Sequence, residues 1–344
     1  MLRLILILGL IFSTQAAMAE ILVGGDDPAC RAAVAFSDPR RGASVLVLKN
    51  GQIICEAYSG EGGPDHRMEI WSGTKSFSGV MAAAAVQDGL LTLDESVSKT
   101  LPQWRDDPRK AKATIRHLLT LSVGIRGQLG RPPSYADAVL MPLEFEPGER
   151  FIYGPGPYQV WGAVMAAKLA AAGQPADPYL YFKRRILDPL GMSDIVWRRT
   201  PTGDLLMPQG AVMTAREWAR FGEFVRGRGA LAGRKLVDPV TLSQLFQSSP
   251  ANPAYGITWW LPHKAPPTDA VGSNLDLGAH AKTFPTDLVI AAGAGDQRLY
   301  VIPSKGLTIV RQASFSIANA LVGRRRADDR WSDTQFLHAV LGAP

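Results

Sequence analysis

The placement of strand-like segments along the chain constrains its fold more than any other feature of the sequence. Two apolar runs, 43–49 and 52–58, flank Asn50-Gly51, a dipeptide that favours a tight hairpin turn. Further strand-like segments occur only near the other end, at 257–261, 288–292, 297–302 and 307–312. Because a sheet must bury a face against another layer, we expect strands from both ends to form one antiparallel sheet flanked by helices.

The middle of the chain is helical in pattern. Apolar residues recur at helical spacing in 77–85, 158–171 and 215–226, and a closing helix is expected at 331–341. The expected fold class is therefore α/β of the α+β kind, with a mostly helical second part. We expect one catalytic unit, 20–344, in which 20–100 and 251–344 form the α/β part and 101–250 the mostly helical part. A cleft between the two parts is the expected place for a site.

The first nineteen residues have the pattern of an export signal. Met1–Arg3 give a positive start, Leu4–Phe12 are apolar throughout, and Ala17-Met18-Ala19 place small residues at a cleavage point. The apolar run is shorter than the roughly 20 residues that a membrane-spanning helix needs. We therefore expect a signal peptide over 1–19, a mature chain beginning at Glu20, no stable membrane insertion after its removal, and a periplasmic or secreted location.

Export changes the expected chemistry of the two cysteines. In an oxidising compartment Cys30 and Cys55 can pair and tie a short N-terminal helix to a strand; two buried free thiols are the alternative.

Composition excludes several other classes of function. The net charge of +6 is mild for 344 residues, and the basic residues are scattered, so no nucleic-acid partner is expected. Two cysteines and five histidines without metal-ligand spacing predict no metal site, and no motif indicates a cofactor.

The strongest chemical signal is the Ser-x-x-Lys pair in the segment WSGTKSF, where a loop becomes a helix. Residues three apart share a helix face, so Lys75 can reach the Ser72 hydroxyl, and a lysine of lowered pKa can take its proton. The alternative is a capping serine with a surface lysine. The apolar stretch 77–86 favours a buried helix instead.

Two further segments can complete this chemistry. Tyr153 precedes a Gly-Pro-Gly turn, and its phenol can relay a proton between Ser72 and a leaving group; a packed turn aromatic is the alternative. The small residues 291–295 join two strands and allow a substrate to approach the backbone closely. We expect the substrate to lie against Gly293 and Ala294, and the N–H groups of Ser72 and Ala294 to hold an oxyanion.

The combination of segments resembles the penicillin-recognising serine hydrolases, which include class C β-lactamases, DD-peptidases, and related esterases and 6-aminohexanoate-oligomer hydrolases. The likeness runs from about Ala43 to Gln312 through IWSGTKSFSG, ATIRHLLTLSVGI, FEPGERFIYGPGPYQVWGAVM and GAVMTAREWARFGEFVRGRGALAGRKLV, in that order. It implies a β-lactamase/transpeptidase-like fold. It further implies that Ser72 is the acylated nucleophile, Lys75 its partner base and Tyr153 the proton relay.

Two departures from the family pattern bear on the substrate. Pro155 stands where the family often has asparagine, and Ala291-Ala292-Gly293 stands where a Lys or His, a Thr or Ser, and a Gly are usual. The resemblance is therefore strongest to the esterase and aminohexanoate-hydrolase branch. We expect a small-molecule ester, amide or peptide substrate. A β-lactamase or DD-peptidase is the second hypothesis, and a catalytically inactive ligand-binding relative is the third.

Overall fold

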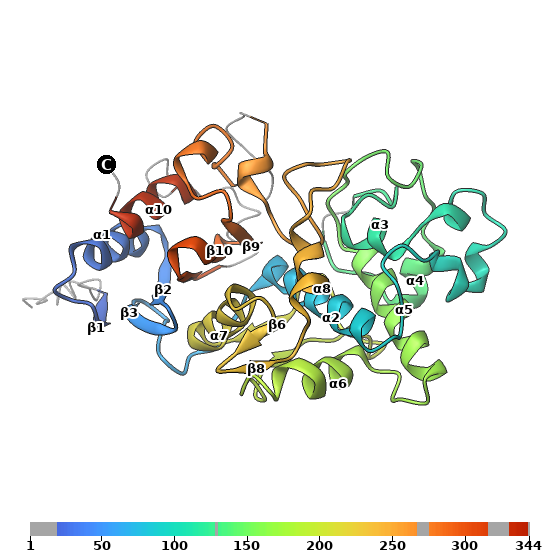
Figure 1. Cartoon of the computed structure of the whole chain (residues 1–344), viewed down its shortest axis with the longest axis horizontal. Coiled ribbons are helices and arrows are strands. Elements are labelled where there is room, and N and C mark those ends of the chain that lie inside the picture. Colours follow the sequence, from blue (N-terminus) through green and yellow to red (C-terminus); the bar gives the residue numbers. More distant parts are fainter. Residues whose placement is uncertain (1–18, 128–129, 267–274, 316–329, 343–344) are drawn as a thin grey trace, which may run out of the picture.

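A computed structural model describes residues 19–127, 130–266, 275–315 and 330–342. Its main sheet has six strands in the order β1-β3-β2-β11-β10-β9, and every neighbouring pair is antiparallel (Figure 1). The strands are β1 (Glu20–Val23), β2 (Gly42–Lys49), β3 (Gln52–Tyr58), β9 (Val289–Gly293), β10 (Gln297–Ile302) and β11 (Leu307–Ala313). Because β11 pairs with β2, strands from the two ends of the chain form one sheet, as the sequence predicts.

The hairpin between β2 and β3 forms for the expected local reason. Asn50 and Gly51 have φ angles of 51° and 84°, the left-handed pair that a two-residue turn between twisted strands requires.

Helices cover both faces of the sheet. Neighbouring residues of β10 show this: the side chain of Leu299 lies against Gly222 of α7 (Ala215–Arg226), whereas Tyr300 donates to Asp333 of α10 (Asp333–Leu341). Side chains alternate between the faces of a strand, so α7 and α10 cover opposite faces. On the α10 side, α1 (Pro28–Ser37) packs beside α10 (Figure 1).

The central helix α2 (Lys75–Gln87) is buried from Lys75 to Ala85. The remaining helices are α3 (Ile115–Leu119), α4 (Tyr135–Leu140), α5 (Gly156–Ala171), α6 (Pro178–Phe182) and α8 (Pro239–Ser243). Of these, α3, α4 and α5 lie on the side of α2 away from the sheet in Figure 1, and α8 packs against α2. Two small sheets, β4-β6-β5 and β7-β8, complete the fold with β4 (Met68–Glu69), β5 (Val196–Trp197), β6 (Ala211–Met213), β7 (Ala230–Leu231) and β8 (Arg234–Lys235). The division into two parts at 100 and 250 stays a prediction, and α7 from the middle of the chain packs on the main sheet.

One predicted strand is wrong. Residues 257–261 form no strand; single bridges join Trp260 to Tyr255 and to Ile290. Thr258 has a φ of 69°, so the chain turns there and its apolar side chains are buried by the turn rather than by a sheet. The edge strand β1 was not expected, because its four residues are mostly exposed and carry no alternating pattern.

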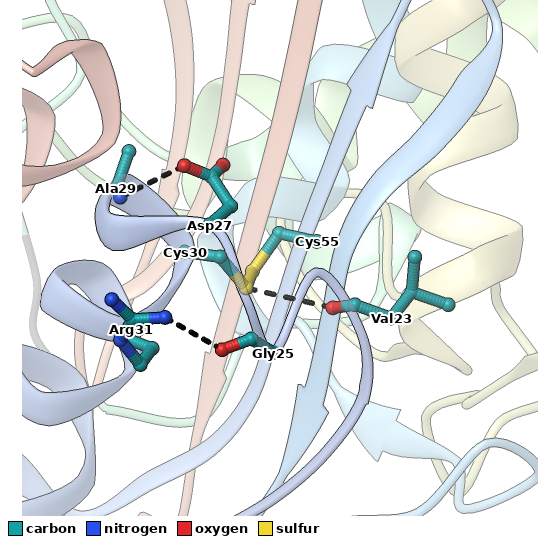
Figure 2. The surroundings of a disulfide bond; sticks show 7 residues. All are labelled: Val23, Gly25, Asp27, Ala29, Cys30, Arg31 and Cys55. Carbon is teal, nitrogen blue, oxygen red and sulfur yellow. Dashed lines mark hydrogen bonds between the residues drawn. A yellow bond between two sulfur atoms is a disulfide. The ribbon is translucent and has the colours of Figure 1, made fainter.

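A disulfide joins Cys30 of α1 to Cys55 of β3, with the two Cα atoms 5.4 Å apart (Figure 2). The structure thus contains the predicted pair rather than two free thiols. The predicted signal peptide lies outside the described residues apart from Ala19. Within the described part of the chain, no helix has the length and apolar character needed to cross a bilayer.

Candidate active site

A cavity of about 400 Å³ opens where the start of α2, the loop before α5 and the β9–β10 turn meet. All five residues expected at the site line it: Ser72, Lys75, Tyr153, Gly293 and Ala294. The other lining residues are Trp71, Gly130, Gly154, Pro155, Gln209, Ala292, Gly295 and Asp296. Five segments separated along the chain therefore converge on one pocket.

Ser72 and Lys75 meet at the junction of two helical segments. A short 3₁₀ turn, Trp71–Thr74, leads directly into α2, whose first residue is Lys75. The Lys75 Nζ and Ser72 Oγ atoms are 2.9 Å apart, within reach for direct proton transfer. Trp71 has a φ of 49°, a left-handed conformation that costs a non-glycine residue free energy and that is typical of functional sites.

The amine of Lys75 lies in an environment that disfavours its charge. The side chain is 4% exposed, and its Nζ donates to the Pro208 carbonyl at 3.0 Å. Among the described residues no carboxylate forms an ion pair with it. Burial lowers the pKa of Lys75, and the interaction with Tyr153, including a hydrogen bond, opposes this without cancelling it. A neutral amine with one N–H on Pro208 can direct its lone pair at the serine hydroxyl.

Tyr153 lies beside this amine. Lys75 Nζ is 4.7 Å from the centroid of the Tyr153 ring, and that ring stacks on Trp260 with centroids 6.0 Å apart. Trp260 is itself buried, so the tyrosine has a rigid support. The hydroxyl, the amine and the phenol that the sequence singled out therefore lie around one pocket.

The end of β9 reaches the nucleophile because residue 293 is a glycine. A Cβ at this position would lie 2.1 Å from the Ile70 carbonyl oxygen, two residues before Ser72. Only glycine lets the two backbones approach so closely. As a result, Ala294 lines the same cavity as Ser72.

Sequence reasoning missed the groups that support the lysine. Gln159 of α5 is fully buried; its side chain accepts from the Met207 N–H at 3.0 Å and donates to the Pro133 carbonyl at 2.8 Å. These bonds fix the segment that presents the Pro208 carbonyl to Lys75. The one available signal was a glutamine in the first turn of a mostly apolar helix.

Two more lining residues were missed, Gln209 and Asp296. Lys75 and Asp296 are the only charged residues among the described ones that line the cavity, and Asp296 pairs with Arg41 at 2.8 Å. The positions that depart from the family pattern, Pro155 and Ala292, also line it and add no charge. The described residues hold no cluster of His, Cys, Asp or Glu suited to a metal ion.

Comparison with known proteins shows the family and the fold of the chain. The family model described as Beta-lactamase matches residues 29–327, most of the chain. The chain belongs to the beta-lactamase family. A candidate beta-lactamase from Bacteroides dorei has a similar structure, with a TM-score of 0.68, 20% identity, and coverage of 88% of this chain and 93% of that one. A family VIII carboxylesterase gives a TM-score of 0.66 at 13% identity, covering 94% and 99%.

Among curated sequences, the lovastatin esterase of Penicillium rubens is 28% identical over 221 residues, 52% of this chain and 54% of that protein. The chain spans 29–54% of the length of the first curated relatives it matches. The family match and the similar solved structures agree on the beta-lactamase fold.

Proposed function

We propose that this protein is an exported serine hydrolase that cleaves an ester or small amide bond through an acyl-enzyme on Ser72. The observation that carries the proposal is the 2.9 Å separation of Ser72 Oγ from the buried amine of Lys75, on the floor of an open cavity. A serine hydroxyl becomes an effective nucleophile when a positioned base removes its proton.

In acylation, Ser72 Oγ bonds to the substrate carbonyl carbon as its proton passes to Lys75. The N–H groups of Ser72 and Ala294 hold the oxygen that becomes negative. As the intermediate collapses, the bond to the leaving group breaks and Tyr153 passes that group a proton, which Lys75 resupplies. Water then attacks the acyl-enzyme, with the same base taking its proton, and releases a carboxylic acid and free Ser72.

The lining of the cavity supports neutral esters and small amides as substrates. A β-lactam or cell-wall peptide carries a carboxylate, and the strand position that the family uses for a basic residue is occupied here by the small residues 291–293. The lovastatin esterase and the family VIII carboxylesterase, both named for ester hydrolysis, support the same preference.

Export is supported by two independent features. The N-terminal residues have the pattern of a cleaved signal, and the Cys30–Cys55 pair is of the kind that persists in oxidising compartments. We therefore propose a periplasmic or secreted location for the mature chain.

The test is a substrate panel on three proteins: the parent, Ser72→Ala and Ser78→Ala. Ser78 is a matched control because it lies on α2, and its buried hydroxyl has no hydrogen-bond partner among the described residues. We expect the parent and Ser78→Ala to hydrolyse p-nitrophenyl esters, with anilides slower and nitrocefin slowest. We expect Ser72→Ala to lose turnover. Equal hydrolysis by Ser72→Ala and the parent refutes the mechanism.

Pro155 and Ala292 favour a second candidate, a relative that binds a ligand without turning it over, because both replace groups that contact substrate in the family pattern. This candidate predicts that the parent shows saturable binding of a peptide and neither hydrolyses the panel nor reacts with a fluorophosphonate.

A further inference from the structure

Two buried arginines lie side by side behind the turn that lines the cavity. Arg298 of β10 and Arg311 of β11 are directly opposite each other in the sheet, and neither side chain is exposed. Adjacent like charges in a protein interior are costly unless partners offset them. The groups that accept hydrogen bonds from Arg298 and Arg311 therefore show which part of the structure these two side chains hold in place.

The guanidinium of Arg298 joins α10 to the β9–β10 turn. Its Nε donates to Asp333 Oδ1 at 2.7 Å, and its Nη1 donates to the carbonyls of Gly293 at 3.2 Å and Gln297 at 3.1 Å. Asp333 is fully buried and also accepts from the Tyr300 hydroxyl at 2.6 Å. The carboxylate thus fixes one edge of the guanidinium while the other edge holds both ends of the turn.

Other arginines hold the middle of the same turn. Arg311 Nη1 donates to the Asp296 carbonyl at 2.9 Å, and Arg41 Nη2 contacts the Asp296 carboxylate at 2.8 Å. Asp296 has a φ of 66°, so this backbone is kept in a conformation that a non-glycine residue rarely adopts unaided.

The bond to Gly293 has a chemical consequence. The Gly293 carbonyl and the Ala294 N–H belong to one planar peptide group. A cationic donor on the oxygen fixes the plane of that group, and by polarising it makes the N–H a stronger donor. Ala294 is the residue whose N–H is expected to hold the oxyanion.

We propose that Arg298, oriented by Asp333, is a positioning residue for acyl transfer that aims and polarises the Ala294 N–H, with Arg41 steadying the far side of the same turn. This inference rests on the proposed function, since it assigns a role within that reaction. It predicts that loss of the arginine contacts to the β9–β10 turn reduces stabilisation of the transition state and leaves ground-state binding of the substrate nearly unchanged.

The test compares Arg298→Lys and Arg41→Gln with the control Tyr300→Phe. Lysine keeps the charge of Arg298 but cannot bond to Asp333 and two carbonyls together. Arg41 is one-third exposed, so its replacement leaves the core intact. Tyr300→Phe removes a buried bond to the same carboxylate without touching the turn.

For Arg298→Lys we expect kcat for an ester to fall about 10- to 100-fold with KM changed by less than about twofold, because a small misplacement near a reacting atom is costly. For Arg41→Gln we expect a loss of about threefold to tenfold. Tyr300→Phe is expected to lower the unfolding temperature with kcat unchanged.

The decisive readout is the rate ratio between an ester and its thionoester, whose sulfur is a weak hydrogen-bond acceptor. We expect the preference for the oxygen ester to shrink in Arg298→Lys and Arg41→Gln, and to stay at the parent value in Tyr300→Phe. An unchanged ratio in the two arginine variants overturns the proposal. If Arg298→Lys does not fold, Arg41→Gln decides alone. A parent protein that fails to hydrolyse any ester refutes the proposed function instead.

Discussion

Replacing Gly293 with alanine is the sharpest perturbation of the site. The new Cβ would lie 2.1 Å from the Ile70 carbonyl oxygen, whereas ordinary van der Waals contact begins at 3.4 Å. Strand β9 and the segment before Ser72 must therefore separate by about 1.3 Å. A displacement of about 1 Å near reacting atoms can cost about 100-fold in rate, or about 2.7 kcal/mol of barrier, and overpacking costs about 1–3 kcal/mol of stability.

The assay measures kcat/KM for a p-nitrophenyl ester together with chemical unfolding, for the parent, Gly293→Ala and Gly25→Ala. Gly25 is the matched control because its added Cβ meets nothing nearer than 4.0 Å and its φ is not left-handed. We expect kcat/KM to fall about 100-fold in Gly293→Ala and to stay at the parent value in Gly25→Ala. A folded Gly293→Ala that retains the parent rate refutes the proposed approach of β9 to the nucleophile.

Three further outcomes follow from the structure. Because burial lowers the pKa of Lys75, the rate of ester cleavage should rise with pH through a pKa below that of an exposed lysine. Lys75→Met should abolish this rise and lower kcat about 100- to 10,000-fold, which a pH–rate profile measures. Tyr153→Phe should slow substrates with poor leaving groups more than p-nitrophenyl esters, which leave without a proton; equal effects on both contradict the relay. Cys30→Ser with Cys55→Ser should lower the free energy of unfolding by about 3 kcal/mol in denaturant titration with kcat unchanged, because the pair closes a loop of 25 residues.

The sequence predicted best those elements whose pattern is local. The residues of α7 and β10 match the expected 215–226 and 297–302 at both ends. Helix α7 has a strong amphipathic periodicity, and β10 is a short run bounded by Gly295-Asp296 and Pro303. The segment 257–261 shows the limit of that reasoning. Its apolar residues are buried, but Thr258 turns the chain against α2, where Gly79 leaves room for it, and that packing comes from the tertiary fold.

Some residues of the site could also be predicted from a local sequence pattern, and others could not. Ser72 and Lys75 were predictable because a spacing of three residues brings two side chains together across one helical turn. Gly293 was predictable because small residues at the end of a strand allow close approach to the backbone. The contact of Lys75 with the Pro208 carbonyl, and the support that Gln159 gives to this segment, were not predictable. Lys75, Pro208 and Gln159 meet only after distant segments of the chain pack together.

The central claim is that Ser72 becomes covalently acylated because Lys75 removes its proton. The most direct measurement is tandem mass spectrometry of the protein quenched during turnover of an ester, with the parent and Ser72→Ala compared. We expect the acyl group on the peptide containing Ser72 in the parent, and no acylated peptide in the variant. Turnover by the parent with the acyl group on another residue, or turnover retained in Ser72→Ala, contradicts it.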